Sequence, residues 1–330
     1  MRLLLAAALL PGVAWAAAAL WFDGPSSRLL AGGFAAAFAF GSAVLLVAMR
    51  PPGRAALIVA AGVVAVAVWW LRIPPSNDRD WLPDVARVAT ARFQGNRVTI
   101  ENVRNFEYRT ETDYTPHWET RTIDLDRLIG ADLFLSFWGP TAIAHTIVSW
   151  EFEDAPPLAV SIETRKEKGE EYSAVRGFFR QFELYYVVAD ERDVIGVRTN
   201  HRGEQVFLYR TRLPLAEARA MLVDYLEEMN RLAEHPRWYN AFTHNCTTAI
   251  RKHRQQIGTA GSFDWRILAN GRLDELMYER HGIDTRLPFP ELRARSDITA
   301  KAKAADGAPD FWRRIREGLP GPAPQVRQEP

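Results

Sequence analysis

The hydrophobic pattern separates the first quarter of the chain from the rest. Three apolar stretches follow one another at residues 3–22, 29–49 and 55–73, with only short polar breaks between them. Each stretch approaches the ~20 residues that an α-helix needs to cross about 30 Å of hydrocarbon. The pattern therefore predicts three transmembrane helices within residues 1–75.

Charges in the short loops indicate how these helices are oriented. Arg2, Arg50 and Arg54 would lie on one side of the membrane, and Arg28 and Arg72 on the other. Because short cytoplasmic loops carry an excess of Lys and Arg, this favours a cytoplasmic amino terminus and a soluble part outside the cytoplasmic membrane. The alternative for the first stretch is a cleavable signal peptide, since it has a basic start, an apolar core and an A-x-A-like end.

The pattern changes after the proline-bearing polar linker at residues 72–83. Residues 214–233 have apolar positions at helical spacing and predict a helix. A second helix is expected to begin at Asn245 or Cys246. Runs rich in β-branched and aromatic residues predict six strands, at 97–109, 131–139, 143–152, 158–165, 182–198 and 204–213.

These elements predict an α+β chain with three parts. The transmembrane helices of residues 1–75 come first, followed by a mixed domain at 76–310 in which an antiparallel sheet packs on helices. The end of the chain is rich in proline after Pro320, and we assign residues 311–330 to a disordered tail.

Charge and cysteine content limit the partners and the covalent or metal sites that the chain can have. The 41 Lys and Arg residues balance 40 Asp and Glu residues, and there is no long basic run, so nothing indicates a nucleic-acid partner. Cys246 is the single cysteine, which excludes an intramolecular disulfide and any multi-cysteine metal site. We expect no metal and no cofactor.

Cys246 has the setting of an activated thiol. In "THNCTT" the residues Thr243 and Asn245 are favoured helix caps and would place Cys246 in the first turn of the helix. Backbone N–H groups and the helix dipole favour a thiolate at this position and lower its pKa. The alternative is that Cys246 is a small buried hydrophobic residue, which is the common state of a lone cysteine.

A cysteine nucleophile needs a base, and His145 is the best candidate. It interrupts an otherwise apolar strand, and a hairpin to the next strand conserves parity, so that Glu163 would lie opposite or diagonal to it. A carboxylate there would hold the imidazole in one tautomer. The alternative is a core histidine beside a surface glutamate. His244 and His253 are closer to the thiol in sequence, and either fits a surface position.

Two segments resemble a known bacterial family. They are "IAHTIVSWEFEDAPPLAVSIETRKEKGEEYSAVRGFFRQFELYYVVADERDVIGVRTN" and "YNAFTHNCTTAIRKH". Between about Val98 and His253 the chain resembles the domain of unknown function 4105, also called the Lnb N-terminal periplasmic domain. The order of His145 before an "NC" helix start is also similar to circularly permuted papain-like folds, a resemblance that covers fewer residues.

The resemblance implies a thiol-dependent acyltransferase. Cys246 would take an acyl chain from a membrane phospholipid as a thioester, with His145 as general base and Glu163 orienting it. The residues that would bind substrate or the oxyanion are Asn245, Arg165, Ser161 and Thr247. The acceptor would be the amino terminus of a lipoprotein, and the protein would lie in the bacterial inner membrane with its soluble domain in the periplasm.

Two other functions remain open from the sequence. The same cysteine, histidine and glutamate could serve a papain-like cell-wall amidase or peptidase. Alternatively, the domain could be a non-catalytic binding or assembly module of the cell envelope. The resemblance is to an amino-terminal module, whereas here the domain follows three membrane helices, which leaves the substrate more open than the chemistry.

Overall fold

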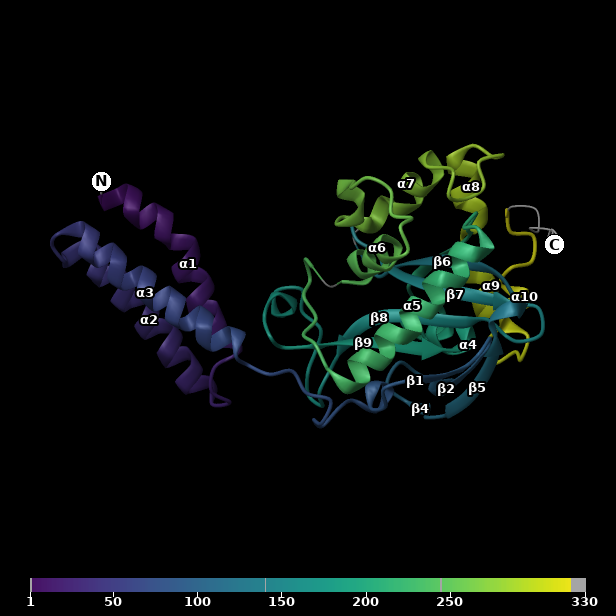
Figure 1. The fold of residues 1–330 in the computed structure, drawn as a ribbon, viewed down its shortest axis with the longest axis horizontal. Coiled ribbons are helices and arrows are strands. Elements are labelled where there is room, and N and C mark those ends of the chain that lie inside the picture. Colours follow the sequence, from purple (N-terminus) through teal and green to yellow (C-terminus); the bar gives the residue numbers. More distant parts are fainter. Residues whose placement is uncertain (1, 140, 244, 322–330) are drawn as a thin grey trace. The chain divides into compact units, whose positions relative to one another are not determined.

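The computed structural model describes residues 2–139, 141–243 and 245–321, and its contacts divide the chain into two compact units. The first unit contains the chain up to Asn77 together with Glu170–Glu183 and Arg237–Ala241. The second contains Asp78–Gly169, Leu184–Pro236 and the chain from Phe242 onward. Figure 1 shows the elements of both units.

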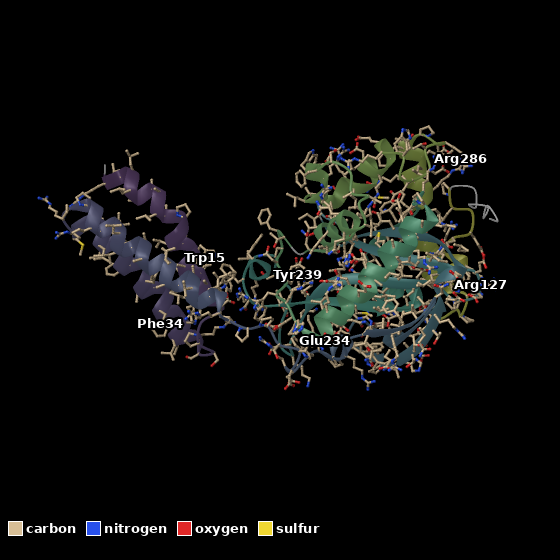
Figure 2. All side chains as sticks on the ribbon, in the orientation of Figure 1. Trp15, Phe34, Arg127, Glu234, Tyr239 and Arg286 are labelled. Carbon is tan, nitrogen blue, oxygen red and sulfur yellow. The ribbon has the colours of Figure 1, made fainter. Side chains whose placement is uncertain are left out.

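The first unit contains three long apolar helices, as predicted. They are α1 (Arg2–Phe22), α2 (Arg28–Ala48) and α3 (Pro52–Leu71), and each has the length and hydropathy of a membrane span. Side-chain nitrogen and oxygen atoms gather near the ends of these helices, and carbon predominates along their length (Figure 2). Trp15 of α1 and Trp70 of α3 pack edge to face with ring centroids 5.5 Å apart.

Two later segments of the chain pack on one end of these helices. The ring of Phe179 stacks on Phe22 at 4.8 Å between centroids, and the guanidinium of Arg180 lies 4.4 Å from the ring centroid of Trp70. The short helix η3 (Arg176–Phe178) adjoins the other segment, because the N–H of Ala241 donates to the carbonyl of Gly177 at 2.9 Å. Residues 170–183 and 237–241 thus belong to the helical unit.

The second unit is built on an eight-stranded, mostly antiparallel sheet. Its order is β1–β2–β9–β8–β7–β6–β10, with β5 also paired to β2, and the contact of β2 with β9 is parallel. The strands are β1 (Thr90–Gln94), β2 (Arg97–Arg104), β5 (Trp118–Asp124), β6 (Leu128–Phe137), β7 (His145–Phe152), β8 (Leu158–Arg165), β9 (Glu183–Ala189) and β10 (Gln205–Arg210). A separate hairpin joins β3 (Glu107–Tyr108) to β4 (Tyr114–Thr115).

Helices cover both faces of this sheet. On one face lies α5 (Leu215–Glu234), where the indole N–H of Trp150 donates to the carbonyl of Ala218 at 2.9 Å. On the other face lies α4 (Glu191–Val194), where Ser149 donates to Glu191 at 2.6 Å. The other α-helices are α6 (Cys246–Gln256), α7 (Leu273–Glu279), α8 (Phe289–Ser296), α9 (Thr299–Ala304) and α10 (Phe311–Arg314). The α+β class is confirmed, and the double cover explains why β7 is buried on both faces.

One predicted strand is too long. The run 182–198 is a strand only to Ala189, after which Asp190 caps α4 by accepting from the N–H of Arg192 at 2.9 Å. A π-helical turn, η4 (Val197–His201), follows. The apolar residues after Ala189 lie in helical turns and are buried in the core, so composition alone did not distinguish helix from strand in this run.

The disordered tail assigned to residues 311–330 is wrong for its first part. Phe311 and Ile315 are buried in the core cluster that also contains Phe134 and Ile147. Arg316 is buried as well, between carboxylates of the sheet and of α4. Burial of these three side chains fixes the segment, and residues 322–330 lie outside the described chain.

Candidate active site

The thiol lies at the start of α6, as the sequence predicts. Asn245 accepts a hydrogen bond from the N–H of Thr248 at 2.9 Å, and the hydroxyl of Thr248 accepts from the N–H of Asn245 at 3.0 Å. This reciprocal cap fixes the first turn, because it uses donors that a helix start otherwise leaves without partners. Cys246 is the first residue of α6 and is 9% exposed.

The β7–β8 hairpin brings the predicted base and carboxylate together. Its register pairs Ile147 with Ser161, and the same register places His145 opposite Glu163. Nε2 of His145 lies 3.7 Å from Oε1 of Glu163. The parity argument from the sequence is therefore confirmed for this pair.

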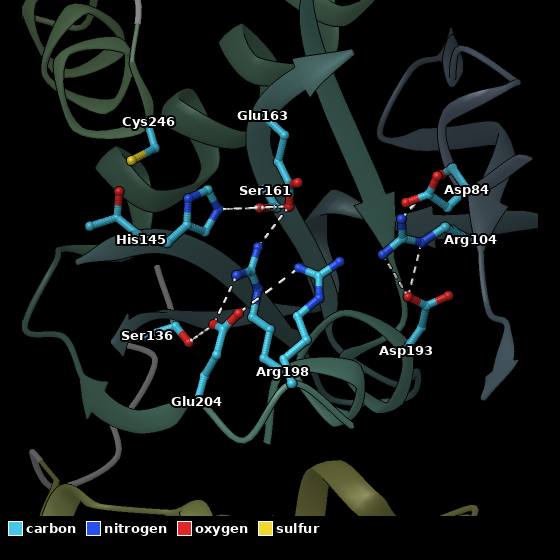
Figure 3. Close-up of polar contacts among 12 residues, drawn as sticks. Asp84, Arg104, Ser136, His145, Ser161, Glu163, Asp193, Arg198, Glu204 and Cys246 are labelled. Atoms are coloured by element: carbon cyan, nitrogen blue, oxygen red, sulfur yellow. Dashed lines mark hydrogen bonds and ion pairs between the residues drawn. The ribbon is translucent and has the colours of Figure 1, made fainter. Parts of the chain in front are cut away.

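Ser161 links the imidazole to the carboxylate. Its hydroxyl donates to Glu163 at 2.7 Å and lies 2.6 Å from Nε2 of His145 (Figure 3). Since the serine proton goes to the carboxylate, Nε2 must carry a proton and donate to Ser161. The tautomer is set in this way, and Nδ1 is left for the thiol, whose sulfur lies beside the ring in Figure 3.

The buried side chain of Arg198 binds the carboxylate of Glu163. Arg198, from η4, donates to Glu163 at 2.9 Å and to Glu204 at 3.1 Å, and Ser136 donates to Glu204 in turn. Burial alone would raise the pKa of Glu163, but Arg198 and His145 hold it well below its ordinary value. Glu163 is therefore ionised and available to stabilise a charged imidazole.

These surroundings favour a thiolate on Cys246. Burial raises the pKa of the thiol, but the charge and hydrogen bond of His145, together with hydrogen bonds from Thr146, lower it to about 6. A thiol with a pKa near 6 is largely ionised at neutral pH, as a nucleophile requires.

Asn270 connects the chain segment that carries Cys246 with the one that carries His145. Its side chain exchanges hydrogen bonds with the backbone of Ala144, at 2.9 and 2.6 Å. The same amide group donates to Thr247 at 2.6 Å and lies 4.0 Å from the sulfur of Cys246. Asn270 thus fixes the spacing between β7 and α6, and it was not predicted because it lies 126 residues from Ala144 in sequence.

The structure gives two predicted substrate-binding residues other contacts. The guanidinium of Arg165 donates to the carbonyls of Val85 and Ala86, both at 2.9 Å, and lies over the ring of Trp81. The side chain of Asn245 caps α6. These contacts stabilise the fold, whereas Ser161 contacts His145 and Thr247 contacts Asn270. A role of the four residues in binding substrate stays a prediction.

A second polar cluster connects α6 with α5 and β9. His253 is buried and not at the surface, because its Nδ1–H donates to Asp224 at 2.5 Å and its Nε2 accepts from Tyr186 at 2.8 Å. The ring of Tyr225 packs against that of His253 in a tilted arrangement, at 3.9 Å between centroids. Burial lowers the pKa of His253, which keeps the ring neutral and α6 anchored to α5. His244, the other histidine considered, lies outside the described residues.

The pH dependence of thiol alkylation tests the contact of Cys246 with His145. In the native chain the alkylation rate with iodoacetamide should follow the thiolate fraction and rise through pH ~6. In His145→Ala the lowering contribution is lost and burial remains, so the midpoint should move up to or above the ordinary thiol pKa. His117→Ala is the matched control, since His117 is 62% exposed. Equal midpoints in all three proteins would contradict the contact.

Comparison with known proteins gives a match to one family model. Residues 114–271 match the family model of the Lnb N-terminal periplasmic domain, a segment that contains Cys246, His145, Ser161, Glu163 and Asn270. No curated protein and no solved structure matches the chain. The papain-like relation stays a prediction. Helices α1–α3 and this family fit a membrane-anchored protein with a periplasmic domain. Residues 114–271 are therefore similar to the Lnb N-terminal periplasmic domain, and they follow three helices with the properties of membrane spans.

Proposed function

We propose that this protein is a cysteine acyltransferase of the bacterial inner membrane. The observation that carries the proposal is the thiol of Cys246 at a helix start, with its pKa lowered to about 6 beside His145. The imidazole is in turn held by Ser161 and Glu163. Nucleophile, base and orienting carboxylate are the parts that covalent acyl transfer requires.

In the first half-reaction the thiolate of Cys246 attacks an ester carbonyl of a phospholipid. A C–S bond forms, and the C–O bond of the ester breaks. The leaving lysophospholipid oxygen takes a proton from the imidazolium of His145, whose charge Glu163 stabilises through Ser161. The products are a thioester on Cys246 and a neutral imidazole.

In the second half-reaction an amine attacks the thioester. The α-amino group of a lipoprotein forms a C–N bond with the acyl carbon and gives its proton to the imidazole of His145. The C–S bond breaks and the thiolate returns, so that the pair regains its starting charges. The family resemblance supports the phospholipid donor and the lipoprotein acceptor, and the three membrane spans support a lipid-borne substrate.

A mass profile of lipoprotein amino termini tests this proposal. In cells that contain the native chain, lipoproteins should carry an N-linked acyl group that is absent from cells containing Cys246→Ala. His117→Ala should behave as the native chain, because the side chain is largely exposed.

Two other results would decide against acyl transfer to lipoproteins. Unchanged lipoproteins with altered cell-wall fragments in Cys246→Ala would identify the amidase or peptidase alternative. If neither changed and the variant still supported growth in cells that depend on this protein, the non-catalytic alternative would hold.

A further inference from the structure

Exposed apolar side chains lie on the chain segments that lead to the site residues. Each of the three chain segments that deliver a site residue carries them: the β6–β7 connection before His145, the segment before Cys246, and the segment before Asn270. We call them the apolar rim, and they are Trp138, Ile143, Phe242, Phe263, Trp265 and Leu268. Phe263 is 61% exposed, Trp265 56% and Trp138 53%.

Contacts around Asn270 bring these segments together. The N–H of Gly271 donates to the carbonyl of Ala142 at 3.0 Å, and the backbone there is so close that a side chain on Gly271 would meet the carbonyl of Thr141. Asn270 then connects the same place to Thr247 in α6. The segments that carry rim residues are thus held together close to Asn270.

The loop that carries Phe263 and Trp265 is also held by α6. Arg251 donates to the carbonyl of Gly261 at 2.8 Å, and its guanidinium lies 5.8 Å from the ring centroid of Phe263. Side chains of this size would be expected inside the domain if they only served packing. Here a supported loop presents them to the outside, which is typical of an interaction surface.

The chain itself indicates what covers this surface. Its three apolar helices fix the protein in a bilayer, so a lipid surface is always within reach of the domain. Trp and Phe are favoured at the boundary between headgroups and acyl chains, where apolar rings leave water without entering the hydrocarbon centre. Four of the six rim residues are Trp or Phe, and Arg251, whose guanidinium lies near the ring of Phe263, can meet lipid phosphate.

We propose that the apolar rim inserts into the interfacial region of the bilayer and holds the mouth of the Cys246 site against the lipid surface. Docking in this way would bring the Cys246 site to the lipid surface. The use of the surface to deliver an ester carbonyl rests on the proposed acyl transfer, whereas the docking itself does not.

A fluorophore placed on the rim tests the docking. The full chain with Cys246→Ser has no cysteine, so Trp265→Cys or Phe263→Cys can each be labelled at one position with an environment-sensitive dye. Reconstituted in vesicles of phosphatidylethanolamine and phosphatidylglycerol, either dye should emit at shorter wavelength than in detergent. Spin-labelled lipid should quench it at least about twofold more than a dye on Arg127→Cys, which lies in the exposed turn η2 (Leu125–Arg127).

Three results would overturn the proposal. Equal quenching at all three positions would show that the rim stays in water. Protection of the dye in detergent that increases with protein concentration would show that a second copy covers the surface. Protection that appears only when envelope proteins are added would indicate a protein partner. Because Cys246 is absent from every labelled protein, none of these results bears on whether acyl transfer occurs.

Discussion

Replacing Cys246 with serine is expected to lower the rate of acyl transfer by about 10⁴-fold or more, since loss of a nucleophile removes the covalent route altogether. The surroundings of Cys246 lower the pKa of a thiol to about 6, which leaves a thiolate at neutral pH. A serine hydroxyl stays protonated there and is a weak nucleophile. The nearly equal size of the two side chains means that the fold should not change.

The thioester itself can be measured. The native full chain in detergent, mixed with phospholipid carrying a radioactive acyl chain, should acquire a label that hydroxylamine releases. The serine variant should acquire none, and its urea unfolding should match that of the native chain. A serine variant that transfers acyl groups at the native rate would contradict the proposed mechanism, whatever the substrate.

Replacing Arg316 with methionine should lower the free energy of unfolding by about 3–5 kcal/mol, because one partner of a buried ion cluster is lost. The side chain of Arg316 is 7% exposed and binds both oxygens of Glu191, at 2.6 and 2.7 Å. It also donates to Asp132 at 3.0 Å and lies 3.7 Å from Glu151. Burial and Asp132 already raise the pKa of Glu151. Without the guanidinium, too little positive charge would remain to balance these buried carboxylates.

Urea unfolding of the full chain in detergent, followed by tryptophan fluorescence, measures this effect. Arg314→Met is the matched control, because Arg314 is 48% exposed and pairs with Asp310 one helical turn away, so its loss should cost within about 0.5 kcal/mol. Arg316→Lys keeps the charge but not the two-pronged contact and should fall between the two. Equal stability of the Arg316→Met and Arg314→Met proteins would rule out a structural role for the buried cation.

The sequence predicted the parts of the site that depend on local rules. Helix capping places Cys246 in a first turn, and strand parity places His145 opposite Glu163, because both rules act over a few residues. Ser161 was predicted as a substrate residue. Its place between His145 and Glu163 follows from a side-chain rotamer that no pattern along the chain specifies.

The residues that were missed depend on contacts between distant segments. Arg198 lies in a run rich in β-branched residues, which read as strand, and only a π-helical turn directs it to Glu163. Arg316 lies close to a proline-rich end, whose composition indicated disorder. Its ion pairs with three carboxylates of distant segments were therefore not predicted. Polar residues of this kind become buried only when a distant partner compensates them, so their role appears with the tertiary structure.

The division of the chain into two interleaved units limits where the protein can be truncated or fused. The boundary between its two units is crossed between residues 77 and 78, 169 and 170, 183 and 184, 236 and 237, and 241 and 242. Deleting the first 77 residues would therefore leave two inserted segments without the helices on which they pack. Proteolysis at the linker would separate these segments from the helices, and gene fusion could not exchange the three helices as an independent module.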